Sequence, residues 1–239
     1  MKFVMILTAL LAAGCASQEH LPTVIWHTDR EALQILAARA ESIRTVSSQG
    51  LLTMQRPDGQ SVRLDLAMVR DNAGDVRLRA WKFGRAIFDF TMTQKGVWMV
   101  LPDDASLRQR VHDSQAGVTK LADTFDVIDG ALFSRPDVKT QSSGEWLICS
   151  DVINDVRIRC EIDRQTLTPR KYTILDPQGV ARFTMELSKY RVIDGIPFAC
   201  KYVAAGDMGV ITISLDDVDL NTELASAAFV APRRAEKVR

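Results

Sequence analysis

The stretch from Val62 to Leu101 alternates apolar and polar residues in four successive runs. A period of two places the apolar side chains on one face of a β-sheet and the intervening polar ones on the other. Gly-containing segments at 71–74, 83–84 and 95–96 separate the runs where hairpins turn. The pattern predicts an antiparallel meander with one charged face and one apolar face rich in aromatic residues and Met.

Two amphipathic helices accompany the strands. The first is expected to start at a Thr28 or Asp29 cap and to end near Thr45, with apolar residues at spacings of three and four. The second is marked by an apolar stripe that ends before Pro136. Its positions are Val118, Leu121, Phe125, Ile128 and Leu132.

Further alternating runs after residue 144 bring the expected total to about ten or eleven strands, nearly all joined by hairpins. The segment 137–144 is expected to be a loop, and the basic tail 233–239 a solvated terminus. The predicted fold is mainly β (α+β). It is a single strongly curved antiparallel sheet or half-open barrel covered by the two helices.

Composition excludes several classes of function. The 239 residues carry no formal net charge, so nothing indicates nucleic-acid binding. Three His and four Cys are too few and too scattered for a metal site. No hydrolase, phosphate-loop or zinc-protease motif occurs, so we expect neither an enzyme nor a cofactor.

The N-terminus is the most specific feature. Lys2 precedes an apolar run over 3–13 that is too short for a membrane span. The run ends in Leu11-Ala12-Ala13-Gly14-Cys15, which resembles the lipobox of bacterial lipoproteins. An ordinary secretory signal with a chance Cys is the alternative.

The lipobox resemblance implies a signal peptide over residues 1–14 and acyl chains, palmitate among them, on Cys15. A tether over 15–27 and one domain over 28–239 follow. A membrane anchor outside the cytoplasm is then expected. Since Ala16 is not Asp, the resemblance also implies the outer membrane of a two-membrane cell, facing the periplasm.

Cys149 and Cys160 flank a turn at Asn154-Asp155, so a two-residue turn places them directly across a hairpin. An oxidising compartment permits a disulfide there, although an unsuitable strand-pair geometry would strain it. Both possibilities stay open.

The apolar faces of the sheet and helices supply the candidate lipid site. They either form a packed core or line a cavity that an end or lid opens. The candidate cavity residues are Leu64, Leu66, Met68, Leu78, Phe88, Phe90, Met92, Met99, Leu121, Phe125, Ile128, Phe183 and Met185.

The order of elements resembles the LolA/LolB-like lipoprotein-carrier fold. Local matches extend over nearly all of the expected mature chain. They are residues 40–45 leading into the first strand, Phe88-Asp89-Phe90, 97–102, Asp194-Gly195-Ile196-Pro197, and the closing Asn221, Phe229 and Pro232.

This resemblance implies an unclosed barrel under helices whose interior takes acyl chains of lipids or lipoproteins, and a role in lipoprotein transport or outer-membrane maintenance. Trp81 and Phe83 occupy the hairpin comparable to the membrane-facing tip of the anchored branch. The alternatives are a structural or sensory module with a filled core that binds a protein partner and, with least support, a hydrolase.

Overall fold

The computed structural model describes residues 20–100, 130, 132–153, 156–207, 209–225 and 227–237, which form one helix, α1 (Asp29–Ser42), and a single 13-stranded sheet. The strands are β1 (Thr45–Gln55), β2 (Ser61–Asp71), β3 (Val76–Lys82), β4 (Arg85–Thr93), β5 (Gly96–Val100), β6 (Lys139–Ser143), β7 (Trp146–Ile153), β8 (Val156–Asp163), β9 (Thr168–Leu175), β10 (Ala181–Ile193), β11 (Ile196–Gly206), β12 (Gly209–Leu220) and β13 (Glu236–Lys237).

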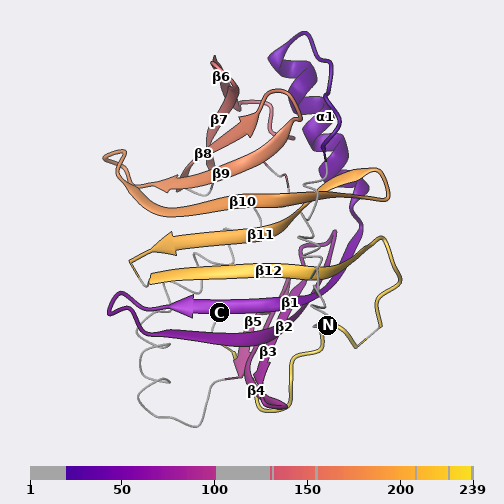
Figure 1. Ribbon diagram of the computed structural model, residues 1–239, viewed down its shortest axis with the longest axis vertical. Coiled ribbons are helices and arrows are strands. Elements are labelled where there is room, and N and C mark those ends of the chain that lie inside the picture. The colour runs from indigo at the N-terminus through magenta and orange to yellow at the C-terminus, as the bar shows by residue number, and fades with distance from the viewer. Residues whose placement is uncertain are drawn as a thin grey trace, which may run out of the picture.

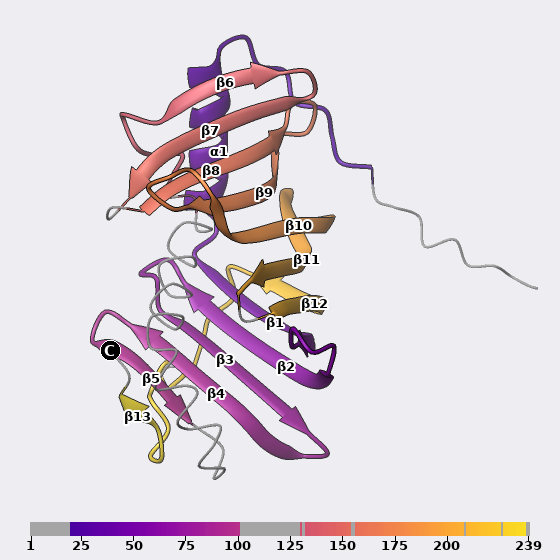
Figure 2. The ribbon, with the colours of Figure 1, turned by 90° about the vertical axis from the view of Figure 1, so that its left-hand side faces the viewer.

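The sheet is antiparallel and open. Its strand order is β13-β5-β4-β3-β2-β1-β12-β11-β10-β9-β8-β7-β6, so two chain-consecutive meanders meet where β1 pairs with β12. The edge strands β6 and β13 lie at opposite ends of the molecule (Figure 2). The sheet bends strongly between these ends (Figures 1 and 2) but does not close into a barrel.

Gly50 makes the junction of the two meanders possible. The β1–β12 register shifts between Gln49 and Gly50. A Cβ on Gly50 would lie 2.0 Å from the main-chain oxygen of Ser214. Only a residue without a side chain allows the two backbones to approach this closely.

Helix α1 begins at an N-cap formed by Thr28, whose hydroxyl accepts a hydrogen bond of 3.2 Å from the Glu31 amide. The Glu31 carboxylate in turn accepts a 2.8 Å bond from the His27 amide. This reciprocal arrangement is a variant of the capping box and fixes the start of the helix.

The buried face of α1, Ala32 and Leu36, packs on strands β7–β10 in a core cluster that includes Leu147, Ile158 and Tyr172. Figures 1 and 2 both show the helix beside this half of the sheet. A second core cluster is built mainly from β1–β5, where the predicted period-two alternation is confirmed by the burial pattern of β2 and β3.

Two strands differ from the sequence-based expectation. The segment 137–144, expected to be a loop, contains β6; its residues are mostly exposed because β6 is an edge strand, so it carries no apolar alternation. The tail, expected to be solvated, contributes β13, which pairs with β5. The sheet therefore has thirteen strands rather than ten or eleven, and the described residues hold one helix rather than two. The expected second helix lies outside them, apart from its end.

Candidate functional site

A cavity of about 110 Å³ lies between the C-terminal half of α1 and the inner face of the sheet. Its floor comes from β9–β11 and the end of β2, and residues Gly130 and Phe133 close one side. Its apolar lining includes Leu36, Ala40, Ile43, Phe133, Leu167, Leu187, Ile196 and Phe198. We refer to it as the α1 cavity.

All three tyrosines of the sequence, Tyr172, Tyr190 and Tyr202, line the α1 cavity. Burial raises the pKa of each phenol, so all three stay neutral and can donate hydrogen bonds. The Tyr190 hydroxyl donates to the Pro169 carbonyl, and the Arg170 guanidinium carbon lies 5.1 Å from the centre of the Tyr190 ring. The cavity wall therefore combines aromatic surface with fixed polar groups.

Two arginines also line the α1 cavity. Arg39, on α1, donates through Nη1 to the carbonyls of Thr166 and Leu167 at 3.1 and 2.8 Å. Arg70, at the end of β2, continues the inward alternation of that strand. Burial lowers the pKa of both guanidinium groups, and the charge of Arg70 acts on the nearby Tyr202 hydroxyl.

Gly130 lines the α1 cavity next to the helix. Its φ is +87°, and a Cβ at this position would lie 2.3 Å from the Cβ of Ala40. Both the backbone conformation and the close approach to α1 favour glycine here. Gly130 therefore lies directly against Ala40 of α1.

The residues that the sequence predicted to line a lipid cavity lie outside the α1 cavity wherever the structure describes them. Leu64, Leu66, Met68, Leu78, Phe90, Met92 and Met99 are buried in the cluster built on β1–β5, Met185 is buried in the cluster beneath α1, and Phe88 and Phe183 are partly buried against these clusters. None of these ten lines the α1 cavity. Leu121, Phe125, Ile128 and Cys15 lie outside the described residues.

The β3–β4 hairpin ends in an exposed aromatic residue. Phe83 is 91% exposed, and it and Gly84 have φ of 51° and 74°. Positive φ at both central residues is the signature of a type I′ turn, and a bulky residue is uncommon there. Trp81 is half-buried and pairs with Ala86. Of the two residues expected at the hairpin tip, only Phe83 projects into solvent.

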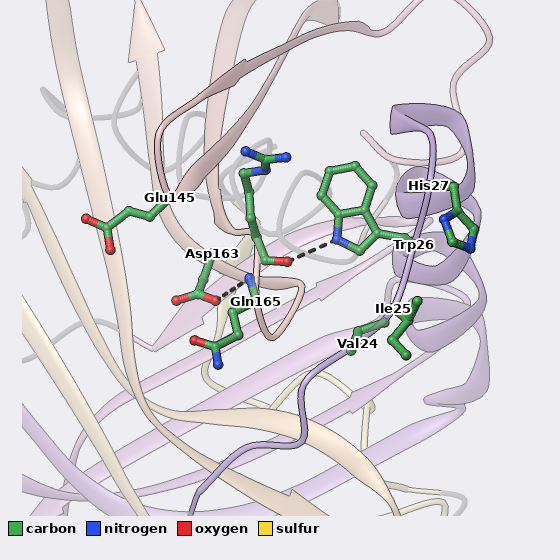
Figure 3. A pocket seen from close by; sticks show the side chains of 8 residues that line it. Val24, Ile25, Trp26, His27, Glu145, Asp163 and Gln165 are labelled. Carbon is green, nitrogen blue, oxygen red and sulfur yellow. Dashed lines mark hydrogen bonds between the residues drawn. The ribbon is translucent and has the colours of Figure 1, made fainter.

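A second hollow, open and about 420 Å³ in volume, lies between the β8–β9 turn and the segment that precedes α1. Figure 3 shows Trp26 beside the turn, with its Nε1 donating to the Arg164 carbonyl at 3.0 Å. The Val24 amide donates to the Gln165 carbonyl at 2.8 Å, and Gln165 Nε2 donates to the Thr23 hydroxyl at 3.3 Å. These bonds fasten residues 23–26 to the β8–β9 turn, so the segment before α1 forms one wall of this hollow.

Cys149 and Cys160 face each other in the β7–β8 register, as the hairpin pattern predicts. Both are buried free thiols in the structure. Burial raises the pKa of Cys149 to about 12 and that of Cys160 well above its usual value. The disulfide stays a prediction. The mass of the unreduced protein tests it, because a disulfide removes two hydrogen atoms.

Two further searches of the described residues gave no site. No helix there is both long and apolar enough to cross a membrane. No three His, Cys, Asp or Glu side chains in the same residues gather as metal ligands.

Sequence reasoning did not identify the polar residues of the α1 cavity. Arg70 was detectable, because it falls at the next even position after Leu64, Leu66 and Met68. The three tyrosines carry no local signal, since they lie on separate strands and come together only through the bend of the sheet.

No protein-family model and no curated protein matches the chain. Several solved structures are similar to this chain. An outer-membrane lipoprotein-sorting protein domain from Vibrio parahaemolyticus has a TM-score of 0.56 and 12% identity, covering 84% of this chain and 95% of its own. A LolA superfamily protein from Nitrosomonas europaea has a TM-score of 0.53 and 12% identity, with coverages of 83% and 97%.

A DUF1329 family protein from Desulfovibrio piger has a TM-score of 0.50 and 11% identity, with coverages of 85% and 98%. The three structures show that this chain has a LolA-like fold. At such identities the similarity concerns the fold alone.

Proposed function

We propose that this LolA-like chain is a lipid-anchored envelope protein that binds the acyl chain of a lipid or lipoprotein and catalyses no reaction. The observation that carries the proposal is the α1 cavity, an aromatic and aliphatic hollow between the helix and an open antiparallel sheet. Concave, mostly apolar sites with a few placed polar groups are typical of small-ligand binding.

The proposed anchor is acylated Cys15, and the proposed location is the outer membrane facing the periplasm. Residues 23–26 are bonded to the β8–β9 turn, so few residues separate Cys15 from the domain. Eight peptide units join Cys15 to Thr23, and they span at most about 29 Å when extended. The anchor therefore holds the domain close to the bilayer.

Phe83 is the proposed second membrane contact. It stands at a hairpin tip between Lys82 and Arg85, and the Lys82 Nζ lies 5.5 Å from the centre of its ring. An exposed aromatic side chain flanked by cations suits the interface of a membrane that contains anionic lipids. Its positive φ is a conformational cost that packing within the domain does not explain.

A fluorescent fatty acid tests the acyl-binding proposal. Ile196 lines the α1 cavity, so Ile196→Trp should fill it and weaken binding by about tenfold or more. Val192, 39% exposed on the same hairpin, gives the matched control Val192→Trp, which should bind like the wild type. Equal binding by both variants, or no binding by the wild type, contradicts the proposal.

Two observations favour a second candidate function, that of a structural or sensory module that binds a protein partner. The ten described residues that were expected to line a lipid cavity lie in the core clusters or pack against them. The α1 cavity is also smaller than the engineered cavity of about 150 Å³ that admits benzene. A pull-down partner retained after delipidation, by a protein that takes up no fatty acid, supports this candidate instead.

A further inference from the structure

A C-terminal strap, made of residues 222–225 and 227–237, follows the last long strand of the sheet. Both views show it leaving the end of β12 and ending in β13 beside β5 (Figures 1 and 2). Asp89 and Thr91 are buried although they belong to the polar face of β4, opposite Phe90. A buried polar face of this kind is an interface with another segment and not a solvated surface.

Arg77 connects this polar face to the strap. Its Nε and Nη2 donate to the two carboxylate oxygens of Asp89 at 3.0 and 2.8 Å, which fixes the plane of the guanidinium. Its Nη1 donates to the main-chain oxygens of Ala228 and Val230 at 3.2 and 3.4 Å. The Arg77–Asp89 pair therefore presents a preorganised donor to two carbonyls of the chain that crosses it.

The end of the strap adds main-chain pairing. Glu236 and Lys237 form β13 and pair in antiparallel register with Met99 and Trp98 of β5. The Lys237 Nζ lies 5.7 Å from the centre of the Trp98 ring. Pairing at a sheet edge recognises the backbone of an added strand, and side-chain contacts such as this one add specificity.

The strap is attached firmly at its beginning and more weakly beyond it. Asn221 shares three hydrogen bonds of 2.7 to 3.0 Å with the segment from Ser42 to Thr45, and the Thr45 hydroxyl donates to the Thr222 carbonyl at 2.6 Å. Beyond this point none of the described strap residues is buried, and β13 has two residues. Segments with little buried surface open at a lower free energy than the whole domain. The strap can therefore detach while Asn221 stays in place.

We propose that the surface formed by Arg77, Asp89, Trp98 and the edge of β5 also binds the C-terminal strap of a second copy of this chain. The strap of the same chain shows what fits this surface: two carbonyls for Arg77, a short strand for β5 and a cation for Trp98. A second copy carries the same segment, and its surface accepts a strap in return. Covalent linkage gives each strap a high effective concentration at its own surface, so the exchange increases with protein concentration.

A fluorescent peptide with the sequence of residues 222–239 tests the binding surface. Wild-type protein should bind it weakly, because its own strap competes with the peptide. Ala228→Pro removes the amide hydrogen that the Ala225 carbonyl accepts at 2.8 Å. This variant should hold its own strap less tightly and bind the peptide about tenfold more tightly than the wild type. A peptide of scrambled sequence is the control and should bind to neither protein.

Arg77→Lys, added to Ala228→Pro, keeps a positive charge beside Asp89 and removes the planar fork. It should therefore weaken peptide binding by about tenfold relative to Ala228→Pro alone. Arg63→Lys in the same background is the matched control. Arg63 is exposed on the neighbouring strand β2, so its replacement should leave peptide binding unchanged.

Trp98→Val tests the same surface without changing Arg77. It removes the ring beneath Lys237 and should also weaken peptide binding by several-fold in the Ala228→Pro background. Urea denaturation midpoints identify the variants that fold.

Native mass spectrometry of unlabelled protein mixed with isotope-labelled protein tests the second copy as the occupant. Dimers of mixed mass should appear, should increase with protein concentration and should decrease several-fold in Arg77→Lys.

Failure of folded Ala228→Pro to bind the peptide overturns the proposal. Peptide binding that survives both Arg77→Lys and Trp98→Val also overturns it. Peptide binding without dimers of mixed mass excludes a second copy as the occupant and overturns the proposal as well. The proposed acyl binding concerns the α1 cavity and stands or falls separately.

Discussion

The indole Nε1 of Trp26 donates a 3.0 Å hydrogen bond to the main-chain oxygen of Arg164, and the Arg164 guanidinium carbon lies 5.3 Å from the centre of the indole ring. This contact joins residues that are 138 positions apart. It holds the segment next to the proposed lipid anchor against the end of the sheet.

Trp26→Ala should release that segment. We expect faster hydrogen exchange at the Val24 amide, which bonds to the Gln165 carbonyl, and a free energy of unfolding lower by about 1–3 kcal/mol. Trp26→Phe keeps an aromatic ring over Arg164. Its exchange rate at Val24 and its free energy of unfolding should therefore lie between those of the wild type and those of Trp26→Ala. Unchanged exchange at Val24 in Trp26→Ala would show that other contacts hold the segment.

Asp89 is 5% exposed and accepts two hydrogen bonds from Arg77, at 3.0 and 2.8 Å. Asp89→Asn leaves the partly buried guanidinium without its counter-charge, so we expect the free energy of unfolding to fall by about 3 kcal/mol or more in urea denaturation. Arg79→Met is the control. Arg79 is more exposed and its Nε is 4.0 Å from Asp89, so its loss should change stability by less than about 1 kcal/mol.

Gly50→Ala should disrupt the pairing of β1 with β12, because the new Cβ would meet the Ser214 oxygen. We expect a loss of at least about 3 kcal/mol in the same denaturation assay. Gly59→Ala serves as the comparison: Gly59 has φ of +86° in an open turn, so only the backbone cost of about 1 kcal/mol applies. Similar losses for both variants would exclude close packing as the cause at Gly50.

Much of the meander could be predicted because β2, β3 and β5 each bury one face. β4 departs from this pattern, since Asp89 and Thr91 of its expected polar face are also buried. The alternation in β2–β5 and the turn residues at their ends are local in sequence, so the hairpins and their order follow from the chain itself. The Thr28 cap of α1 is local in the same sense. The LolA-like fold was recognisable from this order of elements.

The remaining features depend on contacts between distant segments. β6 has polar residues on both faces and β13 has two residues, so neither carries a pattern. The α1 cavity forms only where the bent sheet brings Tyr172, Tyr190 and Tyr202 beneath the helix. The docking of Trp26 on Arg164 has no local signature either.

Phe83→Asn should weaken binding to vesicles that contain anionic lipid by several-fold, measured by sedimentation with unacylated Cys15→Ser protein. Stability should not fall, because Phe83 is 91% exposed and Asn tolerates the positive φ. Val230→Ser, at a 61% exposed apolar position elsewhere, is the control and should bind normally. If Phe83→Asn binds like the wild type, the hairpin does not enter the membrane.

Native mass spectrometry of the protein extracted gently from its own envelope tests the central claim most directly. We predict that wild-type protein retains one additional mass, that of an acyl-bearing ligand beyond any chains on Cys15, and that Ile196→Trp loses it whereas Val192→Trp keeps it. Wild-type protein that carries no ligand, or Ile196→Trp protein that keeps the ligand, would contradict a lipid-binding site beneath α1.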